Sequence, residues 1–142
     1  MKIKNYLEGF SGYCGFGLAL KMLGIEVENH YFSEIDKYAI ANTKYNFPNA
    51  KYVGSIESVY GHFNELDLFT FGWPCQDNSI AGKRKGQRTG TRSGLLFEAI
   101  KVCERFKPRN FVAENVAGLL TVNKGIDIVE SLEVLAFLND SL

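Results

Sequence analysis

Cysteine is scarce in this sequence. The three cysteines, Cys14, Cys75 and Cys103, are odd in number, and none forms a CxxC pair or has a histidine partner at a zinc-site spacing. This pattern argues against a disulfide framework and against a zinc site. Each thiol therefore needs an explanation of its own.

Long apolar runs are also absent. No run approaches the roughly 18–20 residues that span a bilayer, and the N-terminal segment lacks the apolar core of about 7–15 residues found in signal peptides. We therefore expect a cytoplasmic protein with no membrane partner. Proline is rare too, and Pro48, Pro74 and Pro108 all fall between predicted elements, where a missing N–H donor is tolerated.

A net charge is lacking, because 16 Lys and Arg residues balance 16 Asp and Glu residues. The overall electrostatics therefore neither suggest nor exclude a nucleic-acid partner. The balance conceals one basic segment, since five basic residues and no acidic residue stand between Asn78 and Phe97. A glycine-rich basic loop could close over a phosphate backbone, and a merely solvated loop has the same composition.

The composition of the 142 residues, 46% hydrophobic and 13% aromatic, fits one folded domain. Short β-like runs alternate with amphipathic stretches of helical period. The expected strands cover residues 3–10, 26–32, 50–56, 67–73 and 110–115, and the expected helices cover residues 15–23, 36–45, 95–106 and 126–138. This alternation predicts an α/β fold, a mostly parallel sheet with helices on both faces. No strand follows the last helix, so we expect the sheet to be truncated after about five strands.

Two segments at predicted strand ends favour a nucleotide-like ligand. Residues 10–17 form a glycine turn that opens a helix, where backbone amides can meet a ligand, although tight turns that bind nothing have the same glycines. After the second strand, Glu34 and Asp36 stand where an acidic residue of such folds meets ribose hydroxyls. The alternative is that Asp36 or Ser33 merely caps the following helix, and Asp36 is the favoured cap.

Two further segments carry candidate reactive groups. Cys75 follows the fourth strand, at the sheet edge where open α/β folds bind ligands, and nearby cations favour a thiolate. Cys103 lies on the apolar stripe of a helix, which indicates a buried filler. Glu114 ends an apolar strand, where burial would raise its pKa toward proton donation. A capping or loop-bracing role is the alternative for Glu114.

The segments FSGYCGFGLAL, SEIDKYA, GWPCQDNSIAGKRKG, RSGLLFE and AENV occur in this order along the chain. Together they closely resemble the N-terminal motifs of the DNA cytosine-5 methyltransferases. The resemblance implies a Rossmann-like S-adenosylmethionine-dependent methyltransferase fold, with residues 1–142 as the N-terminal part of the catalytic domain. It also implies S-adenosylmethionine as methyl donor and double-stranded DNA with a flipped cytosine as partner.

The resemblance assigns roles to individual residues. Cys75 is implied to be the nucleophile that attacks cytosine C6, and Glu114 to hold N3 and supply its proton. The residues implied to contact the cofactor are Phe10, Gly12, Gly15, Glu34, Ile35, Ser55 and Leu95. The residues implied to contact DNA are Gln76, Ser79, Lys83 and Arg92. No metal is expected.

Two positions depart from the family pattern. Family members usually have glycine where Cys14 stands and an acidic residue where Ser55 stands; a serine hydroxyl can accept the same hydrogen bond without the charge. The family's target-recognition domain and closing C-terminal segments are not found in these residues. We therefore expect transfer to need a complementing C-terminal polypeptide.

The expected function is methylation of cytosine C5 in DNA, in a bacterial, prophage or phage setting such as restriction-modification. One alternative is an inactive fragment or a cofactor-binding subunit that needs a second polypeptide. Another is a nicotinamide-dependent oxidoreductase, which shares the glycine turn and the ribose acid but has no use for the Pro-Cys-Gln segment.

Overall fold

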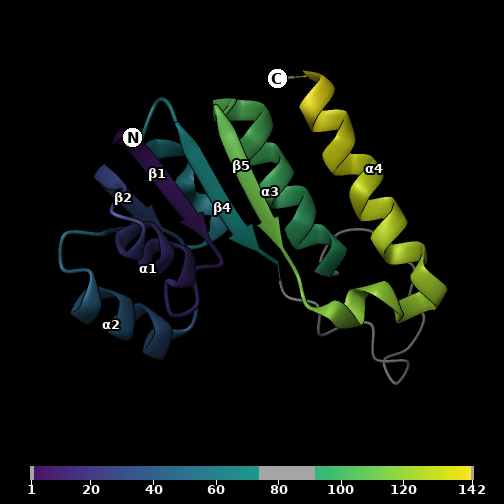
Figure 1. The fold of residues 1–142 in the computed structure, drawn as a ribbon, viewed down its shortest axis with the longest axis horizontal. Helices are drawn as coiled ribbons and strands as arrows, with labels where there is room; N and C mark the ends of the chain where they lie inside the picture. The colour runs from purple at the N-terminus through teal and green to yellow at the C-terminus, as the bar shows by residue number, and fades with distance from the viewer. Residues whose placement is uncertain (1, 74–91, 142) are drawn as a thin grey trace.

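The computed structural model describes residues 2–73 and 92–141. Its described strands form one sheet in the order β3-β2-β1-β4-β5 (Figure 1), and every neighbouring pair is parallel. The strands are β1 (Lys2–Gly9), β2 (Glu26–Phe32), β3 (Lys51–Tyr52), β4 (Leu68–Gly72) and β5 (Asn110–Glu114). The strand order reverses between β1 and β4, and the carboxyl ends at such a point are where open α/β sheets bind ligands.

Helices cover both faces of the sheet. They are α1 (Gly15–Met22), α2 (Lys37–Asn46), α3 (Arg92–Phe106) and α4 (Ile126–Ser141), with short 3₁₀ helices η1 (Ile56–Gly61), η2 (Ala117–Leu120) and η3 (Val122–Gly125). Glu8 of β1 bonds to backbone amides of α1, whereas its neighbour Leu7 belongs to the core cluster that includes α3 residues. Successive side chains of a strand point to opposite faces, so α1 and α3 lie on opposite sides of β1.

Figure 1 shows α1 and α2 beside the β1–β2 half of the sheet, and α3 with α4 beside the β4–β5 half. The α/β architecture expected from the sequence, with its parallel sheet and helices on both faces, is confirmed. Strand β3 is shorter than expected. Gly54 turns the chain with φ +82°, and η1 begins two residues later, so regular pairing ends at Tyr52.

The apolar core lies between the sheet and α3. Leu7, Phe69, Phe71 and Val102 are fully buried there, and η1 closes one end with Ile56 and Val59, its buried residues. Cys103 is 0% exposed in the same cluster, which confirms its role as an apolar filler. Burial raises the pKa of this thiol to about 12, so the sulfur stays protonated and unreactive.

Within residues 2–73 and 92–141, none of the helices combines the length and the apolar character needed to cross a bilayer.

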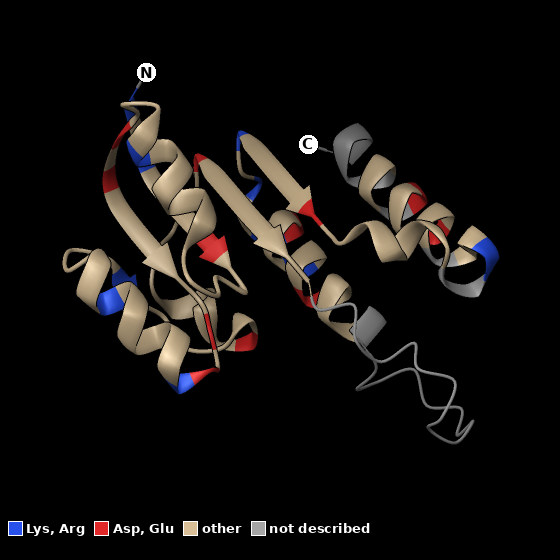
Figure 2. Ribbon diagram, turned by 60° about the horizontal axis from the view of Figure 1, so that its bottom comes forward, with Lys and Arg blue, Asp and Glu red and all other residues tan. Residues whose placement is uncertain are grey.

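Acidic positions lie at strand ends, as the red arrowheads of Figure 2 show. Glu8 is the penultimate residue of β1 and Glu114 is the last residue of β5. The carboxyl edge of the sheet therefore gathers carboxylates from strands that are far apart in sequence.

Candidate active site

The turn after β1 is built from left-handed backbone. Phe10 has φ 52°, Gly12 has φ 52° and Cys14 has φ 63°. Glycine adopts this region freely, whereas each other residue pays about 1–2 kcal/mol. Cys14 thus occupies a backbone conformation that glycine would adopt without this cost. Strained residues of this kind cluster at functional sites because neighbouring contacts hold them in place.

The turn after β1 and the loop after β2 are joined by Glu34. Its Oε2 accepts a hydrogen bond from the Gly12 amide at 2.7 Å, and its Oε1 accepts from the amides of Ile35 at 2.7 Å and Asp36 at 3.0 Å. The Glu34 amide in turn donates to the Gly54 carbonyl at 3.0 Å. A carboxylate has about four acceptor positions, so three backbone donors fix Glu34 and leave it able to accept from a ligand hydroxyl.

Asp36 caps α2. Its Oδ1 accepts from the amides of Tyr38 at 2.9 Å and Ala39 at 2.8 Å, which are otherwise unpaired at the helix start. The capping interpretation of Asp36 is therefore confirmed. Ser33 is not the cap of this helix; it is buried, and its amide donates to the Glu8 carbonyl at 2.9 Å.

Three more of the expected cofactor contacts, Ile35, Ser55 and Leu95, lie within the described residues. Ile35 is 82% exposed directly after Glu34, an unusual position for an isoleucine and a suitable one for packing on a flat ring. Ser55 follows β3 at the start of η1, and its hydroxyl lies 3.4 Å from that of Ser58. Leu95 is partly buried in the first turns of α3, where it packs against the core.

The space around the glycine turn suits a small ligand. A side chain built at Gly12 or Gly15 would meet no atom within 4 Å. Ser11 beside them is buried, and its hydroxyl has no hydrogen-bond partner among the described residues. Buried polar groups are rarely left unpaired, so a polar ligand group at this turn would satisfy Ser11. The turn therefore offers space and one unpaired hydroxyl to a polar ligand.

On the other side of the edge, strands β4 and β5 present Glu114. The parallel register pairs Gly72 with Glu114, and a Cβ at Gly72 would lie 2.7 Å from Glu114 Oε2. The missing side chain of Gly72 thus leaves room for this carboxylate, which is exposed. Asn115 ties the two strand ends together, because its side-chain amide donates to the Trp73 carbonyl at 3.0 Å.

Several expected site residues lie outside the described residues. They are Cys75, Gln76, Ser79 and Lys83, in the segment 74–91. Arg92 begins α3, but its side chain is likewise outside the description. The described residues therefore bring together Gly12 and Glu34, and place Phe10, Gly15, Ser55 and Glu114 at the same edge of the sheet.

Sequence reasoning missed Glu8, which is 1% exposed. Its Oε1 accepts from the Phe16 amide at 3.0 Å, and its Oε2 accepts from the Gly17 amide and the Tyr6 hydroxyl, each at 2.9 Å. Burial opposes its ionisation, but hydrogen bonds outweigh that cost and hold the pKa of Glu8 below its usual value. The available signal was an acidic residue inside an apolar strand, the argument applied to Glu114.

The parallel sheet with helices on both faces has the Rossmann-like fold of a solved methyltransferase. The crystal structure of S. pombe Dnmt2 methyltransferase matches with a TM-score of 0.66. The match covers 94% of this chain and 40% of that chain, at 20% sequence identity. At this identity the likeness concerns the fold alone.

Sequence relatives then give the family. A family model for C-5 cytosine-specific DNA methylase matches residues 5–139. The orphan methyltransferase M.Rho11sI of Bacillus phage rho11s is 41% identical over 119 residues, 82% of this chain and 24% of that protein. The type II methyltransferase M.HgiCI of Herpetosiphon aurantiacus is 36% identical over 140 residues, 98% of this chain and 33% of that protein.

The chain belongs to the C-5 cytosine-specific DNA methylase family. It spans about a quarter to a third of the length of these two relatives.

Proposed function

We propose that this chain supplies the cofactor turn and the catalytic residues for methylation of cytosine C5 in DNA, with S-adenosylmethionine as methyl donor. The setting would be the cytoplasm of a bacterium, including one that carries a phage or prophage with a restriction-modification or orphan methylase. Relatives of both kinds, type II and orphan, support this setting.

The proposed chemistry begins at Cys75. Carbon C5 of cytosine is a poor nucleophile, and addition of the Cys75 thiolate to C6 makes it enamine-like. Glu114 would hold N3 and supply the proton that this addition requires. Loss of the C5 proton after methylation would then expel the thiolate and restore the aromatic ring. The cytosine must leave the helical stack for these groups to reach it.

The cofactor would lie on the turn after β1. When bound, S-adenosylmethionine supplies an electrophilic methyl group. Glu34 would accept from ribose hydroxyls while its three backbone donors hold it, and exposed Ile35 would pack on the adenine. Phe10, Gly12, Gly15, Ser55 and Leu95 would line the rest of the cofactor site. Gln76, Ser79, Lys83 and Arg92 would contact the DNA.

The observation that carries this proposal is the register between β4 and β5. Glu114 lies opposite Gly72, and Cys75 follows Gly72 by three residues in the sequence. The pairing brings the carboxylate of one strand to the end of the strand that precedes the thiol. The Asn115 bond to the Trp73 carbonyl fixes the same two strand ends.

A covalent trap tests the proposal. DNA with 5-fluorocytosine should form an adduct that resists denaturation, because fluorine cannot leave as a proton does. The chain is used together with the segments that follow this region in its relatives, supplied in the same reading frame or in trans. Cys75→Ser should abolish the adduct, whereas Cys103→Ala should leave it. An adduct that persists in Cys75→Ser would mean that another group is the nucleophile.

A second candidate is a cofactor-binding part that acts with a partner polypeptide; the hydrogen bonds that already hold Glu34 and the glycine turn in place support it. Calorimetry of the chain alone with S-adenosylmethionine, followed by the trap with and without the C-terminal part of a relative, separates the two. Binding without transfer, and transfer only after complementation, would favour the partner-dependent form.

A further inference from the structure

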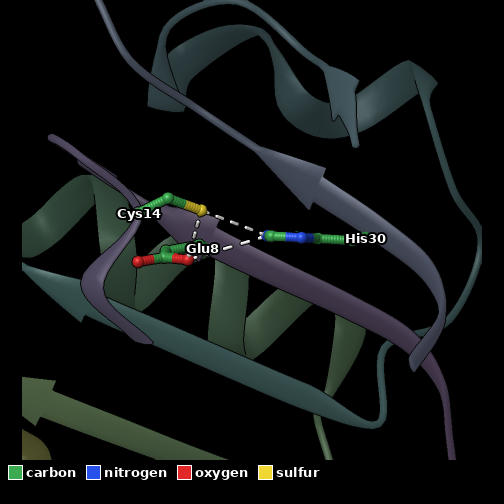
Figure 3. A group of neighbouring side chains, drawn as sticks. All are labelled: Glu8, Cys14 and His30. Carbon is green, nitrogen blue, oxygen red and sulfur yellow. Dashed lines mark hydrogen bonds and ion pairs between the residues drawn. The ribbon is translucent and has the colours of Figure 1, made fainter. Parts of the chain in front are cut away.

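Three potential metal ligands converge beneath the turn after β1 (Figure 3). Cys14 Sγ lies 3.0 Å from Glu8 Oε2 and 3.6 Å from His30 Nε2, and Glu8 Oε2 lies 3.6 Å from His30 Nε2. The three residues come from β1, the start of α1 and β2. Their positions follow no spacing that a zinc motif would show, so the absence of CxxC and spaced histidines left this arrangement undetected.

The separations suit a transition-metal ion. The point in the plane of the three atoms that is equidistant from them lies about 2.0 Å from each, calculated from the printed distances. An ion about 0.7–1.0 Å above that plane would be about 2.1–2.2 Å from all three, against ordinary zinc distances of about 2.0–2.3 Å. The ligand atoms therefore need no large movement to bind an ion.

We propose that Glu8, Cys14 and His30 form a binding site for a divalent ion of the zinc class, with three protein ligands and a fourth position open to water. A mixed set of thiolate, imidazole and carboxylate is one that zinc and its chemical neighbours accept. The proposal is independent of the methylation chemistry, since none of the three residues is assigned to the reacting groups.

Surrounding groups hold the ligands in position. The His30 ring stacks on Tyr6 with centroids 4.7 Å apart and meets the edge of Phe47 at 5.7 Å. A Cβ at Gly17 would lie 2.8 Å from His30 Cε1 and 2.9 Å from Cys14 Sγ, so the site depends on the missing side chain there. Cys14 keeps its left-handed backbone despite the cost, and this conformation accompanies the burial of its sulfur against Glu8.

Charge balance favours the bound ion. The Cys14 thiol donates its proton toward Glu8 Oε2, 3.0 Å from the sulfur. Binding would release that proton to solvent, form the metal–sulfur bond and replace the S–H···Oε2 hydrogen bond. One divalent cation, one thiolate, one carboxylate and a neutral imidazole then sum to zero, which lowers the cost of burial. The Tyr6 hydroxyl, 2.8 Å from Thr70 Oγ1, retains a partner if the ion displaces it from Glu8.

An entry path exists on the side of His30. A cavity of about 460 Å³ between α1, β2 and the end of α2 is lined by residues that include Tyr6, Gly17, His30, Lys21 and Phe47. Glu8 is 1% exposed and Cys14 is 0% exposed, whereas the His30 side chain is 13% exposed. Water can therefore reach the imidazole side of the site, where the fourth ligand would bind.

Cobalt tests the site through its spectrum. The protein is used as a Cys75→Ser, Cys103→Ala double variant, so that Cys14 is the one remaining thiol. Added Co²⁺ should give one equivalent of binding, a thiolate-to-cobalt charge-transfer band and intense visible bands of a four-coordinate site. Zinc should displace the cobalt and raise the Tm.

Two further substitutions complete the test. Cys14→Gly places the residue that this backbone favours and should keep the fold, as circular dichroism would check, but lose the charge-transfer band and the zinc-induced rise in Tm. His30→Gln should weaken cobalt binding at least 10-fold. Absence of a thiolate band in the parent, or a band that survives Cys14→Gly, would overturn the proposal. Binding that His30→Gln leaves unchanged would also overturn it.

Discussion

The carboxylates at the carboxyl edge of the sheet differ in their surroundings between the β1–β2 half and the β4–β5 half. At the ends of β1 and β2, Glu8 is buried and Glu34 is bound by three backbone amides, so both are held by donors of this chain. At the end of β5, Glu114 is exposed, and the carboxylate occupies the space that a side chain at Gly72 would fill. Hydrogen bonds within the chain therefore already fix the carboxylates at the ends of β1 and β2. The carboxylate at the end of β5 is free to contact a ligand.

Because of this difference, substitutions of these carboxylates should affect either the stability of the fold or the methylation activity. Removing a buried, fully hydrogen-bonded carboxylate leaves donors without partners, which costs stability. Removing an exposed carboxylate costs the folded state almost nothing, so any loss of activity reports on the reaction. Substitutions on the two halves should therefore affect different measurements.

Glu114→Gln should give the largest effect on activity. The amide can still contact N3 but cannot supply a proton, and general acid groups contribute about 10²–10⁴-fold to rates. We expect methyl transfer to fall by a factor in this range, measured by incorporation of labelled methyl groups into DNA by the complemented protein.

The same variant should unfold within about 0.5 kcal/mol of the parent, because Glu114 is exposed. Glu104→Gln is the matched control, since Glu104 is an exposed carboxylate on α3 and should alter neither measurement. A Glu114→Gln protein with parental activity would remove Glu114 from the proposed chemistry.

Glu8→Gln should give the largest effect on stability. The amide loses the charge that pairs with the α1 amides and puts an NH₂ group among donors, so we expect a loss of about 2–3 kcal/mol in the free energy of unfolding. Denaturant unfolding in the presence of a chelator measures it. Glu26→Gln, an exposed position at the start of β2, should stay within about 0.5 kcal/mol.

The pH dependence sharpens this test. Because the folded pKa of Glu8 is lowered from 4.5, its contribution is fully present above the unfolded pKa and is lost as the pH falls through the folded pKa. The parent should therefore lose stability on acidification below about pH 4.5 more steeply than Glu8→Gln. Equal slopes for the two proteins would mean that Glu8 is not held ionised by its donors.

The apolar pattern predicted most of the elements but not their contacts. Strand β2 was expected over residues 26–32 and occurs as Glu26–Phe32, whereas α3 begins at Arg92, three residues before its apolar stripe starts at Leu95. The first turn of a helix needs no apolar residue. Hydrophobic periodicity alone therefore predicts the start of α3 too late in the sequence. Boundaries set by backbone turns, such as the one at Gly54, are equally hidden from hydrophobicity.

The sequence likewise predicted some residues of the candidate site and missed others. The glycine turn, Glu34 and Glu114 were found from their places after strands, because parallel strands share one carboxyl edge. The cluster of Glu8, Cys14 and His30 was not found, since it depends on the register that sets Tyr6 opposite His30. Register between strands is a tertiary property, and residues at positions 8, 14 and 30 share no local pattern that would reveal it.

Asp36→Ala should give the smallest of these effects. Loss of an N-cap that accepts from two amides costs about 1 kcal/mol, and denaturant unfolding of the chain should show it. Asp36→Asn is the informative companion, because asparagine caps as well as aspartate but carries no charge. It should keep both the parental stability and the parental affinity for S-adenosylmethionine, whereas Glu34→Gln should weaken that affinity measured by calorimetry. Asp36→Asn could instead weaken cofactor binding at unchanged stability. Asp36 would then bind the cofactor as well as cap the helix, and the ends of β1 and β2 would contribute one more cofactor-binding residue than their hydrogen bonds indicate.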